Sequence, residues 1–147
     1  MKFQSFGDRY QVRLFPGDHL MPSLTALIEQ EGIRYAALSG LGAARHVVIG
    51  YYDAAQKDYE RHEIDEQMEV LSLIGNCSTR DGEPALHIHA TFAQRDLSVI
   101  GGHVFEIETN PTLEIWLRVE DARVERIYND ETHLALLNLP QSLARDR

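Results

Sequence analysis

Most of the chain consists of short segments with the composition of β-strands, and they follow one another too closely for helices to lie between them. Each segment is rich in β-branched or aromatic residues, or alternates apolar with polar side chains. Turn residues separate several of them, as at Asp81-Gly82. Connections this short favour antiparallel pairing over βαβ crossovers. The predicted strands are Tyr10–Leu14, Tyr35–Ser39, His46–Tyr52, Met68–Ile74, Leu86–Phe92, Val99–Ile107, Leu113–Val119 and Val124–Tyr128.

One stretch has a helical pattern instead. Apolar residues recur at helical spacing from Leu20 onward, between Asp18 and Gly32. Asp18 is the predicted N-cap because its carboxylate can accept a backbone N–H that the helix leaves unpaired. Gly32 can adopt the left-handed conformation that ends a helix. The predicted fold class is therefore α+β, with one main helix packed on a curved, mostly antiparallel β-sheet.

Length and composition indicate a single domain. A chain of 147 residues with 44% hydrophobic residues can build one core, and we expect one domain over residues 1–147 with its core at about 10–129. The lone cysteine, Cys77, excludes an internal disulfide and is typical of a reducing compartment. No apolar run approaches the ~18 residues of a membrane span, and the N-terminus has no apolar leader pattern. We therefore expect a cytoplasmic protein without a membrane partner.

The charge of the chain argues against nucleic acid as its main partner. The net charge is −9, whereas duplex DNA is bound chiefly by lysine and arginine. Arg118, Arg123 and Arg126 are close enough in sequence to form a local basic patch. The alternative is that they are solvated and ion-paired on strands. Direct DNA binding is accordingly expected to be weak or absent.

Three histidines form the pattern most informative for chemistry. On a strand, His87 and His89 point to one face and Ile88 points to the other. If the following hairpin turn centres on Arg95, His103 stands opposite His87 and the three rings converge. A turn shifted by half a residue would put His103 on the wrong face. The pair Gly101-Gly102 could correct that shift by forming a β-bulge.

Three imidazoles favour a divalent transition metal such as zinc, iron, nickel or copper over magnesium or calcium, which prefer oxygen ligands. Such a set leaves a fourth position for water, substrate or a carboxylate, as in catalytic zinc sites. Glu114 is a candidate fourth ligand, acceptor for a histidine N–H, or base for a metal-bound water. A surface ion pair is the alternative role for Glu114, and decoration of a polar sheet face is the alternative for the histidines.

The order of several motifs resembles the PPC family (plants and prokaryotes conserved domain) from about Tyr10 to about Asn129. These motifs are Arg13-Leu14 with Gly17-Asp18, Gly40-Leu41-Gly42, Gly50-Tyr51-Tyr52-Asp53 with Tyr59, Glu69-Val70-Leu71-Ser72-Leu73-Ile74-Gly75-Asn76, Asp81-Gly82, His87-Ile88-His89, Ile100-Gly101-Gly102-His103-Val104 and Thr112-Leu113-Glu114-Ile115.

The resemblance implies an α+β fold, a homotrimer, and a metal held by the H-x-H…G-G-H histidines, which are His87, His89 and His103 here. Family members are often described as predicted DNA-binding proteins, because the plant domain follows an AT-hook. This chain has no Arg-Gly-Arg-Pro core and no basic arm. The plant function therefore transfers poorly to it.

Three hypotheses for function follow. The first is a trimeric, metal-binding interaction or regulatory module that acts through a protein partner, with any DNA contact weak. The second is a metal-dependent enzyme, a hydrolase or lyase, acting on a small anionic molecule. The third is a purely structural metal domain. Because structural zinc normally has four protein ligands, a fourth protein ligand would separate the third hypothesis from the second.

Overall fold

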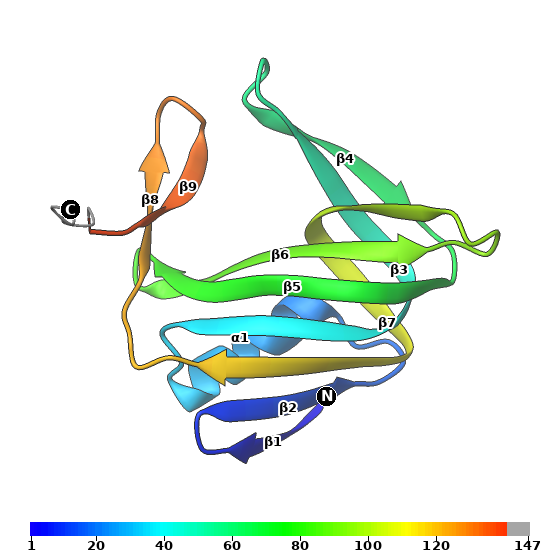
Figure 1. The fold of residues 1–147 in the computed structure, drawn as a ribbon, viewed down its shortest axis with the longest axis horizontal. Helices are drawn as coiled ribbons and strands as arrows, with labels where there is room; N and C mark the ends of the chain where they lie inside the picture. The colour runs from blue at the N-terminus through cyan, green and yellow to red at the C-terminus, as the bar shows by residue number, and fades with distance from the viewer. Residues whose placement is uncertain (141–147) are drawn as a thin grey trace, which may run out of the picture.

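The structure is a computed structural model that describes residues 1–140. One sheet of nine strands dominates it, accompanied by one helix (Figure 1). In chain order the elements are β1 (Lys2–Phe6), β2 (Arg9–Leu14), α1 (Leu20–Glu31), β3 (Ala36–Asp53), β4 (Asp58–Ile64), β5 (Met68–Arg80), β6 (Glu83–Ala93), β7 (Val99–Val119), β8 (Glu125–Asn129) and β9 (Leu134–Asn138).

The prediction of an α+β class with a helix as a main layer is wrong. The described chain is mostly β, and its single helix has 12 residues. The sheet is also mixed, because β8 pairs with β5 in parallel while the other pairings are antiparallel. The physical reason is strand length: pairs of predicted strands fuse into long ones, and segments expected to be loops add further strands.

Four of the strands pair in a closed cycle. β3 lies between β5 and β7, while β6 pairs with both β5 and β7. The inward side chains of this cycle form one apolar core with the buried face of α1, which runs from Leu20 to Ile28. Phe92 is the largest fully buried side chain. Because side chains alternate along a strand, the buried Ile88 of β6 leaves its neighbours His87 and His89 on the outer face.

The ends of α1 agree with the sequence in part. Gly32 has φ +64, the left-handed conformation, and the N–H groups of Gly32 and Ile33 bond to carbonyls of the last turn. The predicted N-cap is wrong, because His19 occupies that position and caps no N–H with its side chain. Asp18 instead accepts hydrogen bonds from the N–H of Phe15 and from the N-terminal ammonium group.

Two predicted strand pairs are each one strand in the structure. Residues 36–53 form β3 and residues 99–119 form β7, with irregularities in register that let the strands bend without ending. At Gly42 the φ is +151, and a Cβ there would lie 2.3 Å from the carbonyl oxygen of Thr112. Only glycine allows the two strands to approach this closely.

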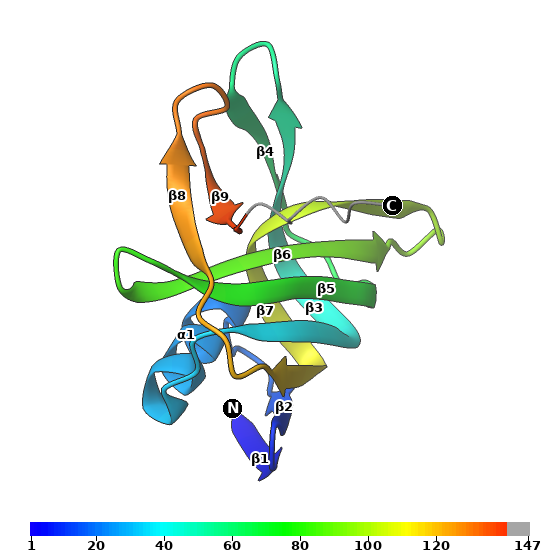
Figure 2. The ribbon, with the colours of Figure 1, turned by 60° about the vertical axis from the view of Figure 1, so that its left-hand side comes forward.

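Two hairpins stand out from the outer face of the sheet. One consists of the far end of β3 with β4, and the other of β8 with β9; their tips approach each other in Figure 2. The Tyr52 hydroxyl on the first donates a 2.6 Å hydrogen bond to the Thr132 carbonyl on the second. The space between the hairpins is where the predicted site lies.

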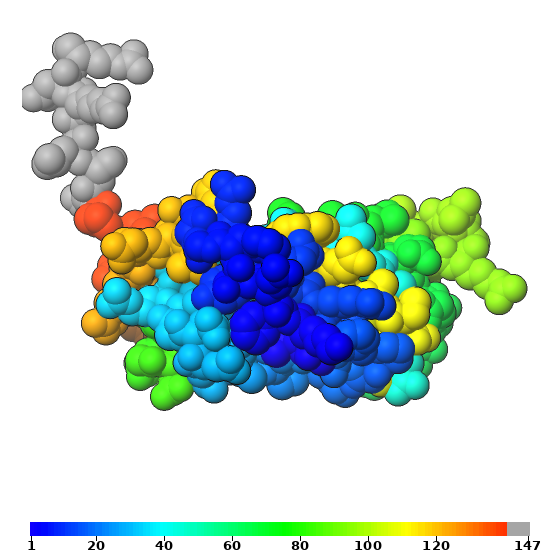
Figure 3. Space-filling model, turned by 90° about the horizontal axis from the view of Figure 1, so that it is seen from below, coloured from blue at the N-terminus to red at the C-terminus, as the bar shows by residue number. Residues whose placement is uncertain are grey.

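The side of the molecule away from these hairpins is formed in part by β1, β2 and α1. Seen from below, β1 and β2 in dark blue lie beside the α1 segment in lighter blue, and the β6–β7 turn projects at one end (Figure 3). No helix among residues 1–140 is long and apolar enough to cross a membrane.

Candidate metal centre

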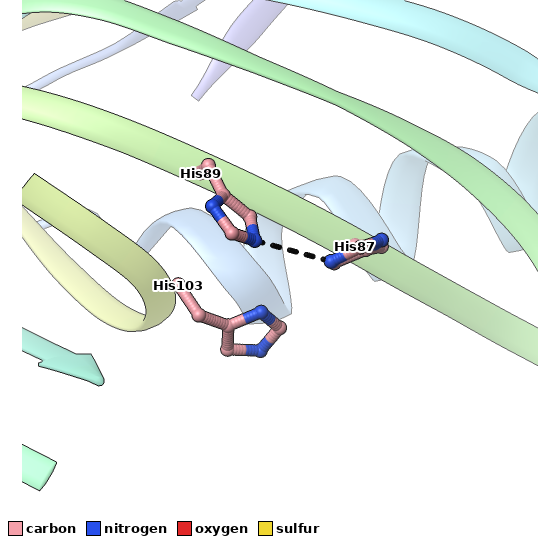
Figure 4. A group of neighbouring side chains, drawn as sticks. All are labelled: His87, His89 and His103. Carbon is pink, nitrogen blue, oxygen red and sulfur yellow. Dashed lines mark hydrogen bonds between the residues drawn. The ribbon is translucent and has the colours of Figure 1, made fainter. Parts of the chain in front are cut away.

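Two adjacent strands bring the three predicted histidines together. His87 and His89 project from the outer face of β6, while Ile88 between them is fully buried in the core. His103 projects from β7, and its closest register partner on β6 is His89. In Figure 4 the three rings face a common centre.

The register differs from the predicted one. His103 pairs with His89, not with His87, because the turn is centred one residue later than Arg95. Residues 94–98 form the turn, and Leu97 adopts a left-handed φ of +68 inside it. Moving the turn centre by a whole residue slides the pairing by two, so His103 keeps the predicted face.

The distances match a compact ligand set. The Nε2 atoms of His87 and His89 are 3.2 Å apart. Ring centroids of the three pairs are separated by 5.1, 5.2 and 5.4 Å. Zn–N bonds of ~2.0 Å place neighbouring ligands of a tetrahedral site about 3.3 Å apart. The two β6 imidazoles therefore already lie at nearly the spacing that a bound ion requires.

One ring atom is left without a partner. Among the described residues, Nδ1 of His103 is buried and makes no hydrogen bond. Such an atom carries an uncompensated desolvation cost unless something binds it. A cation at the centre of the three rings would satisfy it, so the side chains fit a metal ion.

Burial keeps the rings in the form that binds metal. It lowers the pKa of His103 to about 4, and the neighbouring histidines, Arg61 and Arg126 add to the effect. Burial also lowers the pKa of His87, helped by Arg126 and then His89. Only a neutral imidazole offers a lone pair to a cation, so both rings are ready ligands at neutral pH.

The structure does not bring Glu114 to this centre. Glu114 lies far along β7, where it pairs with Arg13 on β2 and Leu41 on β3. The group of potential ligands within 4.8 Å of one another at the site contains only the three histidines among residues 1–140. The role suggested for Glu114 therefore has no support within one copy of the chain.

A second group of potential ligands contains a histidine whose pKa is raised, whereas the pKa values of His87 and His103 are lowered. His46, Glu63 and Asp65 gather near the other end of β4, and Nδ1 of His46 is 2.5 Å from a carboxylate oxygen of Asp65. That hydrogen bond raises the pKa of His46, against a smaller effect of burial. The shift favours the protonated form, in which His46 is an ion-pair partner of Asp65, and we assign no metal to this group.

A pocket of about 250 Å³ opens beside the three histidines. His87 and His103 form one wall, Tyr59 of β4 another, and Arg126 of β8 a third. The Tyr59 ring lies 4.7 Å from the His103 ring, centroid to centroid. Sequence reasoning assigned Tyr59 to no site and placed Arg126 only in a candidate basic patch, because both residues reach the histidines only through the two hairpins.

The comparisons with known proteins agree with this architecture. The sequence matches the family described as the Plants and Prokaryotes Conserved (PCC) domain over residues 1–120. Among curated proteins no sequence match was found. A Bacteroides thetaiotaomicron protein, provisionally named a DNA-binding protein, superposes with a TM-score of 0.90 at 26% identity, over 93% of this chain and 96% of its own.

Two archaeal structures are more similar in sequence. A plant- and prokaryote-conserved (PPC) protein from Pyrococcus horikoshii has a TM-score of 0.85 and 30% identity, covering 96% of this chain and 97% of its own. A metal-containing protein from Archaeoglobus fulgidus has a TM-score of 0.83 and 35% identity, covering 95% of this chain and 100% of its own.

Proposed function

Because the chain belongs to the Plants and Prokaryotes Conserved domain family, we propose that it is a homotrimeric, metal-binding interaction or regulatory module. One divalent transition-metal ion, zinc before others, is held by His87, His89 and His103. The remaining coordination position of the ion is occupied by a small anion.

The observation that carries the proposal is the convergence of three imidazoles around a buried, unpartnered Nδ1 of His103. Their chemistry favours a borderline transition metal over an oxygen-loving ion. The 35% identical relative from Archaeoglobus fulgidus is named as a metal-containing protein, which supports the same conclusion.

The donor set also favours a ligand-binding site over a structural one. Structural zinc sites normally have four protein ligands, and the described part of one chain brings only three together. A divalent ion there would supply Lewis-acid chemistry at its remaining position. The residues of the chain fix its place, because Ile88 in the core holds β6 and the adjacent Gly75 lets β5 approach.

The outer face of the sheet supports the proposed trimer. Trp116 is 43% exposed and Ile74 is 62% exposed, and both flank Ser39 on neighbouring strands. Leu41 and Leu71, about half exposed, lie near the Gly40–Gly42 irregularity on the same sheet. Contiguous apolar surface of this kind is typical of an interface between chains. The number three comes from the family resemblance.

Metal content and mass test the proposal together. We expect protein purified without a histidine tag to elute as a particle of three times 16.7 kDa with close to one divalent ion per chain. Light scattering coupled to gel filtration, followed by elemental analysis of the same fraction, gives both quantities. A monomer mass at every concentration would refute the trimer, and a metal-free fraction from metal-supplemented cells would refute the site.

A metal-dependent hydrolase or lyase is the second candidate function. The observation that favours it is the pocket beside the histidines, which contains Tyr59 and Arg126 as hydrogen-bond donors. A small anionic molecule could therefore contact the ion and a protein donor at once. Turnover of such a molecule, lost on metal removal and restored by metal addition, would decide for the enzyme.

Direct DNA binding is not part of the proposal, although some relatives carry that designation. The chain has a net charge of −9, and Arg118 and Arg123 are each bonded to a neighbouring glutamate. We expect no complex with duplex DNA near the ~10⁻⁸ M typical of specific binders at physiological salt. Fluorescence anisotropy with excess competitor DNA measures this, and a competitor-resistant nanomolar complex would contradict it.

A further inference from the structure

We propose that Arg126 binds a carboxylate in the histidine pocket, so that the ligand of this site is a short organic acid. One carboxylate of the acid contacts the guanidinium group, and a second oxygen-bearing group reaches the ion on the histidines. The inference rests on the proposed metal site and names the class of ligand that the site takes.

Within residues 1–140, Arg126 differs from the neighbouring arginines in having no acidic partner. Arg118 bonds to Glu120 and Arg123 bonds to Glu125. The half-buried Arg126 instead donates to three neutral oxygens, those of Ser78, Asn76 and Ala135. Among residues 1–140 it enters no salt bridge. Its charge is therefore partly desolvated and uncompensated, a condition that an anion relieves.

The same hydrogen bonds fix the guanidinium group next to the histidines. Asn76, which receives the 2.8 Å bond from Nη2, is the register partner of His87 across β5 and β6. Paired residues of antiparallel strands point to the same face, so Arg126 is tied to the position beside His87. Burial of the guanidinium lowers its pKa, and its charge contributes to the lowered pKa of both His87 and His103.

Donors remain free for a ligand. A guanidinium group has five N–H donors in a planar fork. The three hydrogen bonds of Arg126 use one donor on Nε and one on each terminal nitrogen. One N–H is left on Nη1 and one on Nη2, and each can donate to a carboxylate oxygen. Because the group is already held in place, little side-chain entropy is lost on binding.

The walls of the pocket select an acid that is short and partly apolar. Among the residues that the structure describes, no Asp or Glu lines the pocket, and Arg80 is a second arginine in its wall. In a chain of net charge −9, a pocket without a carboxylate is a local positive region. Ala85 and Leu86 on one side and Leu134 and Leu136 on the other supply apolar contact. A volume of about 250 Å³ limits the ligand to a small molecule.

The hairpin that carries Arg126 lies beyond the family match. The matched region ends at residue 120, whereas β8 and β9 span 125–138. β8 is joined to the sheet by one parallel pairing, Thr79 with Glu125, which places Arg126 next to Ser78 and Asn76. The match to the family model therefore assigns no role to Arg126.

Calorimetry on the metal-loaded full chain tests the proposal, with succinate and malonate as probes and acetate as the single-carboxylate reference. We expect a dicarboxylate to bind the wild type more tightly than acetate does. Arg126→Gln should weaken dicarboxylate binding by at least about tenfold, the value of a charge-assisted hydrogen bond, and leave acetate binding and metal content nearly unchanged. The matched control is Arg123→Gln, which removes an ion-paired arginine outside the pocket.

A second variant leaves Arg126 in place. Leu136 is 42% exposed at the pocket rim, so Leu136→Glu should fold and offer Arg126 an internal carboxylate. It should weaken dicarboxylate binding about tenfold or more, whereas Leu136→Gln should not. Equal dicarboxylate affinity in all variants of known metal content, or no binding by the metal-loaded wild type, would overturn the proposal. Absence of metal from the wild type would instead refute the metal site itself.

Discussion

Replacing His103 by alanine is expected to reduce the metal content from about one ion per chain to nearly none. His103 is the only one of the three proposed ligands that comes from β7, and its buried Nδ1 has no hydrogen-bond partner in the described chain. Even hydrogen-bond partners of metal ligands cost 10–100-fold in affinity when removed, so loss of a ligand should cost at least about 100-fold. Competition with a chromophoric chelator measures the affinity directly.

The controls separate this site from nonspecific binding. His62→Ala removes an exposed histidine of β4 that belongs to neither group of potential ligands. It should leave the metal affinity unchanged. His46→Ala tests the second group, which should contribute no tight site because His46 is paired with Asp65. Wild-type metal affinity in His103→Ala, together with a loss in His46→Ala, would move the site to the other end of β4.

Adding a single methyl group at Gly75 is expected to damage both the fold and the site. A Cβ there would lie 2.1 Å from the carbonyl oxygen of His87, and this backbone atom cannot rotate away. Gly75→Ala must therefore push β5 and β6 apart where His87 is attached. Overpacking of this kind costs typically 1–3 kcal/mol, and a domain of this size loses about 2–4 °C in Tm per kcal/mol. We also expect a clear loss of metal affinity, since His87 moves.

Gly82→Ala is the matched control for that experiment. Gly82 has φ +90 in the tight turn between the same two strands, and a Cβ there meets nothing within 4 Å. The left-handed backbone makes alanine unfavourable by about 1–2 kcal/mol, but His87 keeps its place. Gly82→Ala should lose stability and retain its metal. Thermal denaturation and metal titration of both variants decide the matter, and a Gly75→Ala protein with wild-type values in both would contradict the expectation.

The face occupied by His87 and His89 was predictable because it depends only on whether their spacing along the strand is odd or even. His87 and His89 are two residues apart, so any strand places them together. The register partner of His103 depended on the turn, where Leu97 adopts a conformation rare for a non-glycine residue. No residue pattern in the turn predicts that conformation. The prediction that His103 pairs with His87 was therefore wrong. Because the register differs from the predicted one by two residues, His103 still lies on the same face as His87 and His89.

The remaining parts of the site depend on elements whose sequences are weak strand patterns. β4 is mostly exposed and charged around Glu60–Glu63, so it lacks the alternation that marks a half-buried strand. β8 was predicted, but not its parallel pairing with β5, since sequence carries no mark of a pairing partner. The three arginines near β8 therefore looked alike in sequence. Two of them are ion-paired and one lines the pocket.

The hairpin origin of the three histidines bears on the conformational entropy of the unfolded chain. A metal ion that links His89 to His103 would close a short loop. The pairing of Arg9 with Arg118 closes a much longer loop, whose length in residues is that of the short loop doubled roughly three times. Each doubling of loop length is worth only ~0.6 kcal/mol, so a cross-link at the histidines restricts the unfolded chain by about 2 kcal/mol less than one across β2 and β7 would. The proposed ion would therefore add little to the stability of the fold by this route, and its position on a local hairpin suits the binding of a ligand better than the cross-linking of the chain.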